Sequence, residues 1–330
     1  GKIVHFETVG KLNLDTGEPL KSDSLFRIYS MSKPIVTTAA MMLHEEGKFQ
    51  LDEPVAKYLP AFDKTKVLVN GIEVEATHKF TIRELMSHTA GLSYGIFGDS
   101  TVDRQYRAAK ILSEATLEEM VDDLGKIPLL YQPGSRWVYS VSVDVLGRLV
   151  EVISGMPLDT FLAERMFTPL GMKDTFFQVP ADKVSRFGTN HNRNREGQLT
   201  VMDRPADSNY TKEVTFFSGG GGLVSTAMDY LRYSQMMLNG GSLNGVQIVS
   251  PKTVELMASN HLQAGVSSGF GERPGAASTF AFGLGFGVAT ERPLDSLGSK
   301  GEFNWGGAAG TIFWVDPEEE LTAVLMVQMM

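Results

Sequence analysis

The sequence predicts an α/β protein of the α+β type, in which an antiparallel sheet flanked by helices joins a mainly helical domain. Strand-like segments lie near both ends of the chain, helical patterns fill its middle, and turn signals separate the C-terminal strands. The 330 residues, 42% of them hydrophobic, suffice for one large domain or two closely packed ones. We therefore expect residues 1–50 and 215–330 to form the α/β domain and residues 51–214 the helical domain, with the functional site at their interface.

In the first third of the chain, apolar periodicity, glycine and proline set the element boundaries. A strand pattern at residues 3–9 is followed by a second at 25–29. An apolar helical run over 35–46 ends at Gly47, a residue type common just after a helix. The remaining expectations are a short helix at 51–60 and a helix over 81–92 that Gly91 stops.

Helices continue through the middle of the chain, and strands return at its end. Apolar periodicity predicts the helices 113–124, 143–153, 158–167, 226–238 and 251–258. Residues 180–213 are polar and irregular, which predicts a loop that lines or covers something. Glycines 219–222 indicate a close-packed strand or turn. Alternating apolar residues predict strands at 282–290, 311–315 and 321–328.

Composition excludes several classes of function. A net charge of −9 argues against nucleic-acid binding, because a phosphate backbone favours a basic surface. No run of about 18 apolar residues is present, so no membrane span is expected. The absence of cysteine removes thiol catalysis, disulfides and thiolate metal sites. Composition leaves the oligomeric state and the compartment open.

The stretch Ser30-Met31-Ser32-Lys33-Pro34 is the first candidate for chemistry. It opens the helical run over 35–46, and a proline near a helix start is tolerated because first-turn N–H groups have no partner within the helix. A serine and a lysine three residues later share one helix face. The serine can act as a nucleophile, and a lysine buried among apolar neighbours can be neutral enough to take its proton. The alternative is that Ser30 or Ser32 only caps the helix.

Two later stretches strengthen the catalytic interpretation. Tyr139-Ser140-Val141 follows a proline-glycine turn, and a tyrosine beside a cationic lysine can relay a proton. Gly306 and Gly307 follow Trp305 and precede a strand. Paired glycines let a substrate approach the backbone, where a free N–H can point at an oxyanion. The alternatives are ordinary aromatic packing for Tyr139 and a plain turn for Gly306 and Gly307.

In this order, the three stretches resemble the serine hydrolases of the class C β-lactamase and penicillin-binding-protein fold, most closely the family VIII carboxylesterases. The segment 81–92, Pro133-Gly134 and the segment 221–226 also match, so the resemblance covers nearly the whole chain. It implies Ser30 as the acylated nucleophile and Lys33 with Tyr139 as the general-base pair. It also implies an oxyanion hole formed by the backbone N–H groups of Ser30 and Ala308, with neither cofactor nor metal.

Two departures bear on the substrate. Many β-lactamases of this fold have asparagine where this chain has Val141, and lysine where it has Trp305. Asparagine would bind an amide and lysine a carboxylate, so we expect Val141, Trp305, Gly306 and Gly307 to form a site for short-chain neutral esters, with long acyl chains poor. A β-lactamase or D-alanyl peptidase, an acyltransferase and a catalytically idle binding protein are the alternatives.

The resemblance also bears on the chain ends. Family members usually carry a helix before the first strand and another after the last. This chain starts beside an expected strand and stops inside an apolar run at 321–330. We therefore expect the natural protein to extend beyond both ends.

Other motifs fail on their context. Gly265-Val266-Ser267-Ser268-Gly269 matches the nucleophile elbow, but the last histidine, His261, precedes it, whereas the elbow requires a later one. His44-Glu45 begins a zinc motif, but Lys48 stands where the second histidine is needed. Glycines 219–222 lack the following lysine of a phosphate loop. His88 is expected to hydrogen-bond a loop beside the site rather than to act in catalysis.

Overall fold

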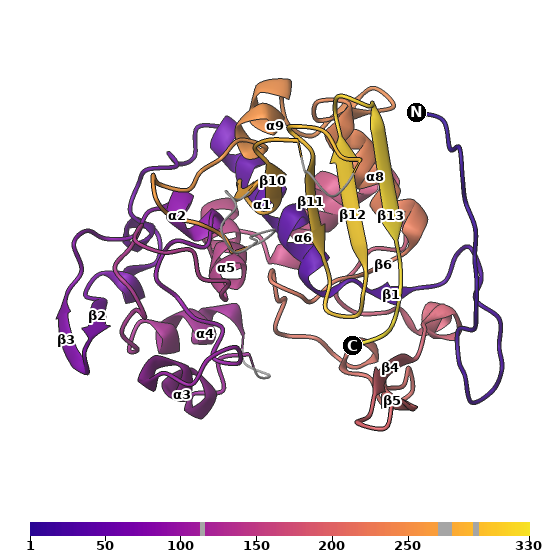
Figure 1. Ribbon diagram of the computed structural model, residues 1–330, viewed down its shortest axis with the longest axis horizontal. Helices are drawn as coiled ribbons and strands as arrows, with labels where there is room; N and C mark the ends of the chain where they lie inside the picture. The colour runs from indigo at the N-terminus through magenta and orange to yellow at the C-terminus, as the bar shows by residue number, and fades with distance from the viewer. Residues whose placement is uncertain (113–115, 270–278, 293–296) are drawn as a thin grey trace.

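The computed structural model describes residues 1–112, 116–269, 279–292 and 297–330. Its main sheet is antiparallel, with the strand order β13-β12-β11-β10-β9. In Figure 1 this sheet lies beside a group of helices and a hairpin that form the other side of the molecule. The main-sheet strands are β9 Phe280–Phe282, β10 Gly287–Ala289, β11 Phe303–Gly306, β12 Ile312–Asp316 and β13 Leu321–Leu325.

Two long helices connect the sheet to the helical part. Helix α1, Ser32–Glu45, is buried through its first twelve residues, because its apolar and small side chains meet neighbours on every side. It contacts α5, Ser142–Ser154, in the helical part. Helix α8, Ala227–Leu238, packs on β12 and β13 and lies behind them in Figure 1. The start of α1 therefore lies where the two parts meet.

The helical part contains short helices with well-defined starts. Three of them begin with a reciprocal hydrogen-bond pair between the cap residue and the third residue of the helix, as in Thr81 with Glu84. These helices are α2 Ile82–Met86, α3 Thr101–Ala108 and α4 Leu117–Leu124. Beside them, β2 Lys66–Val69 and β3 Ile72–Glu75 form a hairpin.

The remaining elements are short. The other helices are α6 Leu158–Leu162, α7 Thr168–Leu170 and α9 Pro251–Met257, with a π-helical turn at Ala163–Phe167. Paired strands are β1 Phe26–Arg27 with β6 Val224–Ser225, β4 Asn190–Arg193 with β5 Leu199–Asp203, and β7 Ser242–Leu243 with β8 Val246–Gln247. The 3-10 turns are Tyr29–Met31, Val55–Lys57, Pro60–Phe62, Ala181–Arg186 and Asn209–Thr211. No helix within the described ranges is long and apolar enough to cross a membrane.

The structure corrects the expected strands. Residues 3–9 are exposed and form no strand, and only Phe26–Arg27 of the segment 25–29 is extended. All five strands of the main sheet therefore come from the last fifth of the chain. The expected strand 282–290 is two strands, β9 and β10, separated by a tight turn. The expected loop 180–213 contains the β4–β5 hairpin.

The expected helices are mostly present with shifted ends. The helix predicted over 81–92 ends at Met86, because His88 takes a left-handed backbone conformation with φ of 58°. The helix predicted over 113–124 is α4, and residues 113–115 lie outside the described part. Between 51 and 60 the chain forms a 3-10 turn at Val55–Lys57 instead of an α-helix.

Candidate active site

Ser30 lies in the 3-10 turn Tyr29–Met31, immediately before α1, and its side chain is partly exposed. The preceding residue, Tyr29, has φ of 42°, a left-handed conformation that is uncommon for a residue with a side chain. The Tyr29 hydroxyl accepts a hydrogen bond of 2.9 Å from Asn190 Nδ2. Backbone strain of this kind is found at functional sites and persists where surrounding contacts fix it. Here those contacts fix the turn that carries Ser30.

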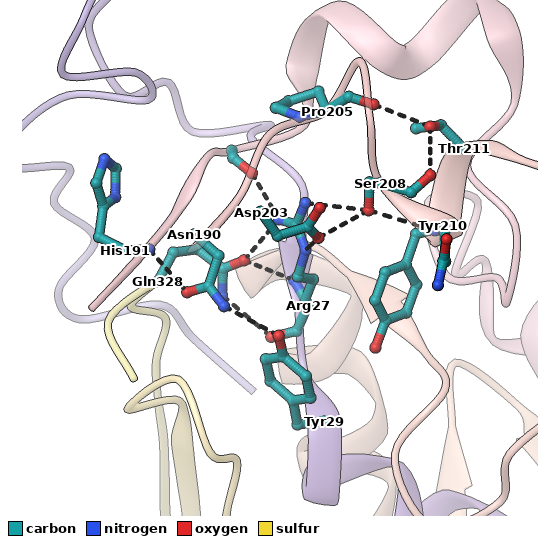
Figure 2. Close-up of polar contacts among 12 residues, drawn as sticks. Arg27, Tyr29, Asn190, His191, Asp203, Pro205, Ser208, Tyr210, Thr211 and Gln328 are labelled. Atoms are coloured by element: carbon teal, nitrogen blue, oxygen red, sulfur yellow. Dashed lines mark hydrogen bonds and ion pairs between the residues drawn. The ribbon is translucent and has the colours of Figure 1, made fainter. Parts of the chain in front are cut away.

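A buried polar network lies next to Tyr29 in this turn (Figure 2). The Arg27 guanidinium is inaccessible to solvent and lies 3.8 Å from the centre of the Phe187 ring. Its Nε donates to Asp203 Oδ2 at 2.6 Å, and its Nη1 donates to the Gly188 carbonyl at 2.6 Å. The Gln328 side chain accepts from the Arg27 N–H at 3.0 Å and donates to the Arg27 carbonyl at 3.1 Å. Distant segments are thereby tied to the strand that leads to Ser30.

Lys33 lies one helical turn after Ser30 and is completely buried. Its Nζ is 3.2 Å from Ser30 Oγ, 3.3 Å from the Tyr94 hydroxyl and 2.6 Å from the Gly220 carbonyl. These three contacts match the three protons of an ammonium group. The nucleophile and the lysine predicted from the sequence are therefore in contact.

The expected neutral state of Lys33 is not supported. Burial alone would lower the pKa of this lysine, but the phenols of Tyr94 and Tyr139 and the carboxyl of Asp144 outweigh it and raise the pKa above its usual range. The surroundings of Lys33 are polar rather than apolar. The raised pKa favours the cationic form of Lys33, and a cation cannot accept the proton of Ser30.

Tyr139 lies beside this cation. Lys33 Nζ lies 4.6 Å from the centre of the Tyr139 ring. The Tyr139 hydroxyl is buried, and a side-chain hydrogen bond with Tyr139 contributes to the raised pKa of Lys33. A phenol oxygen beside a cation can take part in proton transfer to or from a reacting group. The ring packs against Trp137, stacked at 6.0 Å, and Trp305, tilted at 5.5 Å.

Tyr94 is a site residue that the sequence analysis missed. Its ring lies 5.5 Å from the Tyr139 ring, in addition to its hydroxyl contact with Lys33. Burial raises the pKa of Tyr94 to about 12, although Lys33 opposes the shift. The phenol therefore stays protonated and acts as a neutral partner of the ammonium group. No motif in the sequence marks this tyrosine.

The third stretch approaches the same turn. Trp305 is nearly buried on β11, and Gly307 lies just beyond the strand end. A Cβ at Gly307 would come within 2.4 Å of the Ile28 carbonyl and 2.2 Å of Thr311 Oγ1. Gly307 is thus required for close packing beside the turn that carries Ser30, and its expected role in substrate approach stays a prediction. Ala308 is exposed, and its N–H donates no hydrogen bond within the described residues.

Val141 does not line the site as predicted. Its side chain has 0% exposure and belongs to the hydrophobic core at the start of α5. The comparison with asparagine in β-lactamases of this fold predicted the chemistry of position 141 but not that its side chain would be buried. The position therefore lacks an amide group, but its valine side chain does not contact solvent or a substrate.

Asp144, on α5, is a second residue that the sequence analysis missed. Its carboxyl is fully buried, and burial raises its pKa, opposed by Lys33. Oδ1 accepts hydrogen bonds from Ser218 Oγ and from the Gly220 N–H, the latter at 3.0 Å. A Cβ at Gly220 would meet Asp144 Oδ2 at 2.3 Å, which explains this glycine in the 219–222 run as a close approach. An acidic residue five positions after a tyrosine was too weak a signal to find it.

The alternatives to Ser30 have other roles. Ser32 is buried, and its Oγ accepts a hydrogen bond from the Leu223 N–H at 3.1 Å. Ser267 lies exposed in a segment without a preceding strand. His88 is buried, its Nδ1 lies 3.2 Å from Ser140 Oγ, and burial lowers its pKa well below the usual range. As expected, His88 supports the loop that carries Tyr139.

Comparison with known proteins identifies the family. The β-lactamase family profile matches residues 1–330. This chain belongs to the β-lactamase family. It is similar to the esterase EstB of Burkholderia gladioli, with 31% identity over 99% of this chain and 83% of EstB. Protein Rv1367c of Mycobacterium tuberculosis is 34% identical over 99% of this chain and 83% of that protein.

A solved structure confirms the predicted fold. EstCE1, described as a hydrolase with promiscuous acyltransferase activity, superposes with a TM-score of 0.83. Its sequence is 26% identical, and the match covers 97% of this chain and 84% of EstCE1. The β-lactamase-family serine hydrolase fold and the resemblance to family VIII esterases are thereby confirmed.

Proposed function

We propose that this protein is a serine carboxylesterase that hydrolyses short-chain neutral esters through an acyl-enzyme on Ser30. One observation carries the proposal: Lys33 Nζ lies 3.2 Å from Ser30 Oγ and 4.6 Å from the centre of the Tyr139 ring. A nucleophile, a cation and a phenol are then adjacent at the start of a buried helix. The esterase EstB, which shares this family, supports the reaction class.

In the first half of the reaction, Ser30 Oγ attacks the ester carbonyl carbon. The pair of Lys33 and Tyr139 must lack one proton before it can accept the proton of Ser30. In this reactive state Lys33 keeps its proton, and Tyr139 is the acceptor. The phenolic oxygen of Tyr139 takes the serine proton, because the neighbouring ammonium stabilises negative charge there. The backbone N–H groups of Ser30 and Ala308 receive the developing oxyanion.

In the second half, the carbon–oxygen bond to the alcohol breaks, and the alcohol leaves with the proton held by the pair. A water molecule then attacks the acyl group and gives a proton to the same pair. The bond between the acyl carbon and Ser30 Oγ breaks, the pair returns this proton to Oγ, and the acid is released. An alcohol in place of water would give acyl transfer. The description of EstCE1 as a hydrolase with promiscuous acyltransferase activity favours this as the second candidate function.

The test is covalent labelling followed by peptide mapping. We expect a fluorophosphonate to add one adduct, on Ser30, and Ser30→Ala to lose turnover of nitrophenyl butyrate by on the order of a thousandfold or more. Ser267→Ala, in an exposed segment, serves as the matched control and retains both labelling and turnover. An adduct on Ser267, or full activity in Ser30→Ala, would overturn the proposal.

A further inference from the structure

Two adjacent apolar side chains are exposed on the loop between α2 and α3. Ile96 is 61% exposed and Phe97 is 71% exposed. Burying apolar side chains stabilises a folded protein, so a chain that leaves two of them in water forgoes that stabilisation. Single exposed apolar residues are ordinary on protein surfaces, but a fixed pair beside a reactive group indicates a binding surface.

The loop that presents them is held in place by helix α3. The Gly95 carbonyl accepts a hydrogen bond of 2.5 Å from Arg107 Nη1, and the Gly95 N–H donates to Ser93 Oγ at 3.0 Å. The Ser93 hydroxyl in turn donates to Asp103. Contacts on both sides of the loop therefore fix its shape, and the exposure of Ile96 and Phe97 is a property of the fold.

Phe97 also continues the aromatic surface of the active site. Its ring centre lies 5.4 Å from that of Tyr94 and 6.1 Å from that of Tyr139. Tyr94 in turn contacts Lys33 through its hydroxyl. The Phe97 ring thus contacts the ring of Tyr139, while most of the Phe97 side chain remains accessible to a ligand.

The chemistry determines which part of an ester would meet this surface. In the reaction proposed above, the pair of Lys33 and Tyr139 returns its proton to the alcohol oxygen as the ester bond breaks. That oxygen must lie within hydrogen-bond reach of the pair at that moment. The group attached to it therefore extends on the Tyr139 side of the site, which is the side where Phe97 lies.

Building on the proposed function, we propose that Ile96 and Phe97 bind the alcohol part of the substrate and select esters of apolar, ring-containing alcohols. The acyl part remains short, and the ring of the alcohol packs on the two exposed side chains. Apolar and aromatic contacts of this kind contribute without any polar partner, so the selected alcohol is uncharged. The loop thus sets substrate choice, while Ser30, Lys33 and Tyr139 perform the reaction.

The experiment compares two acetates whose leaving alcohols have similar acidity, ethyl acetate and 2-(2-naphthyl)ethyl acetate. The readout is the ratio of their kcat/KM values, with active sites counted by fluorophosphonate labelling. We expect the wild-type ratio to favour the naphthyl ester by about tenfold, and the double variant Ile96→Ser, Phe97→Ser to remove most of that preference. The matched control is Ile72→Ser, because Ile72 is 68% exposed on the outlying β3 (Figure 1). We expect Ile72→Ser to keep the wild-type ratio.

Each failure has its own signature. Ester turnover with an unchanged ratio in the double variant would overturn the binding surface and leave the esterase proposal standing. Absence of turnover for every ester, together with absence of labelling at Ser30, would overturn the esterase proposal itself. A third substrate, ethyl 2-naphthylacetate, has its ring on the acyl side. Loss of selectivity in the double variant for this ester alone would overturn the assignment to the alcohol.

Discussion

The buried carboxylate of Asp144 accepts a hydrogen bond from the N–H of Gly220, and the carbonyl of Gly220 accepts one from Lys33 at 2.6 Å. A single glycine thus joins a buried negative charge to the catalytic cation. Asp144 also stabilises that cation directly through its charge. The positive charge of Lys33 beside Tyr139 therefore depends on the position of Asp144 in α5, in addition to the stretches that contain Lys33 and Tyr139.

Asp144→Asn tests this relationship. The substitution keeps the size of the side chain and an oxygen that can accept from the Gly220 N–H and the Ser218 hydroxyl, but it removes the charge. We expect kcat to fall about tenfold to a hundredfold with little change in KM, because positioning of the lysine fails while the substrate surface remains. Ser218→Ala removes one donor to the same carboxyl and keeps its charge, so its loss of kcat should be smaller. Equal kcat in wild type and Asp144→Asn would contradict the role of the charge.

Some of this site could be predicted from the sequence, and the reason is local. Ser30 and Lys33 are three residues apart at a helix start, so helical geometry alone brings them together. Tyr94, Asp144 and Gly220 reach Lys33 only through tertiary packing, and no spacing rule connects them. The predicted strand at 3–9 failed for a related reason: apolar alternation describes a strand only where a neighbouring strand is available to pair.

Tyr94→Phe should weaken catalysis without abolishing it. The variant keeps the ring that packs against Tyr139 and Phe97 but removes the hydroxyl 3.3 Å from Lys33. Loss of one hydrogen bond to a charged group is worth about 1.5–3 kcal/mol, of which only the part felt in the transition state lowers kcat. We therefore expect a decrease in kcat of about threefold to thirtyfold. Tyr139→Phe should lose far more, and comparable losses in the two variants would contradict the assignment of Tyr139 as the proton acceptor.

Arg27→Leu should destabilise the fold. Arg27 is fully buried, and its removal takes the cation from the Asp203 carboxylate, to which Ser208 still donates, and the Nη1 donor from the Gly188 carbonyl (Figure 2). Breaking a buried ion pair typically costs about 3–5 kcal/mol. Urea unfolding at constant pH measures the loss in the free energy of unfolding. Arg104→Leu is the control, because its ion pair with Asp99 is exposed and should contribute little. A similar midpoint for Arg27→Leu and wild type would show that the network is dispensable.

The pH profile of kcat/KM should show a loss on the acidic side only. A base catalyst loses activity on acidification, because the group that must accept the Ser30 proton is then already protonated. Burial lowers the pKa of His88 well below its usual range, so this histidine stays neutral and does not set the acid limb. The raised pKa values of Lys33 and Tyr94 keep both groups protonated to about pH 10. Protonation of buried Asp144, whose pKa burial raises above its usual range, removes the charge that stabilises the Lys33 cation and adds to the loss on the acidic side. An acid limb that persists unchanged in Tyr139→Phe would contradict this assignment.

We propose that Trp305 governs the choice between neutral substrates and substrates that carry a carboxylate. Its ring is nearly buried and packs against Tyr139 at 5.5 Å and Phe282 at 5.1 Å, so this position offers an apolar surface where a cation would hold a substrate carboxylate. A penicillin or a D-alanyl peptide would bring a carboxylate and an amide to a site without their partners, since Val141 is buried and apolar. Each unpaired group costs about 1–3 kcal/mol, or roughly tenfold to a hundredfold in rate.

We expect kcat/KM for nitrophenyl acetate or butyrate to exceed that for a penicillin by at least about a hundredfold. The measurement is steady-state hydrolysis of both substrates by one preparation with titrated active sites. A kcat/KM for the penicillin equal to that for the ester would show that Trp305 does not exclude charged substrates.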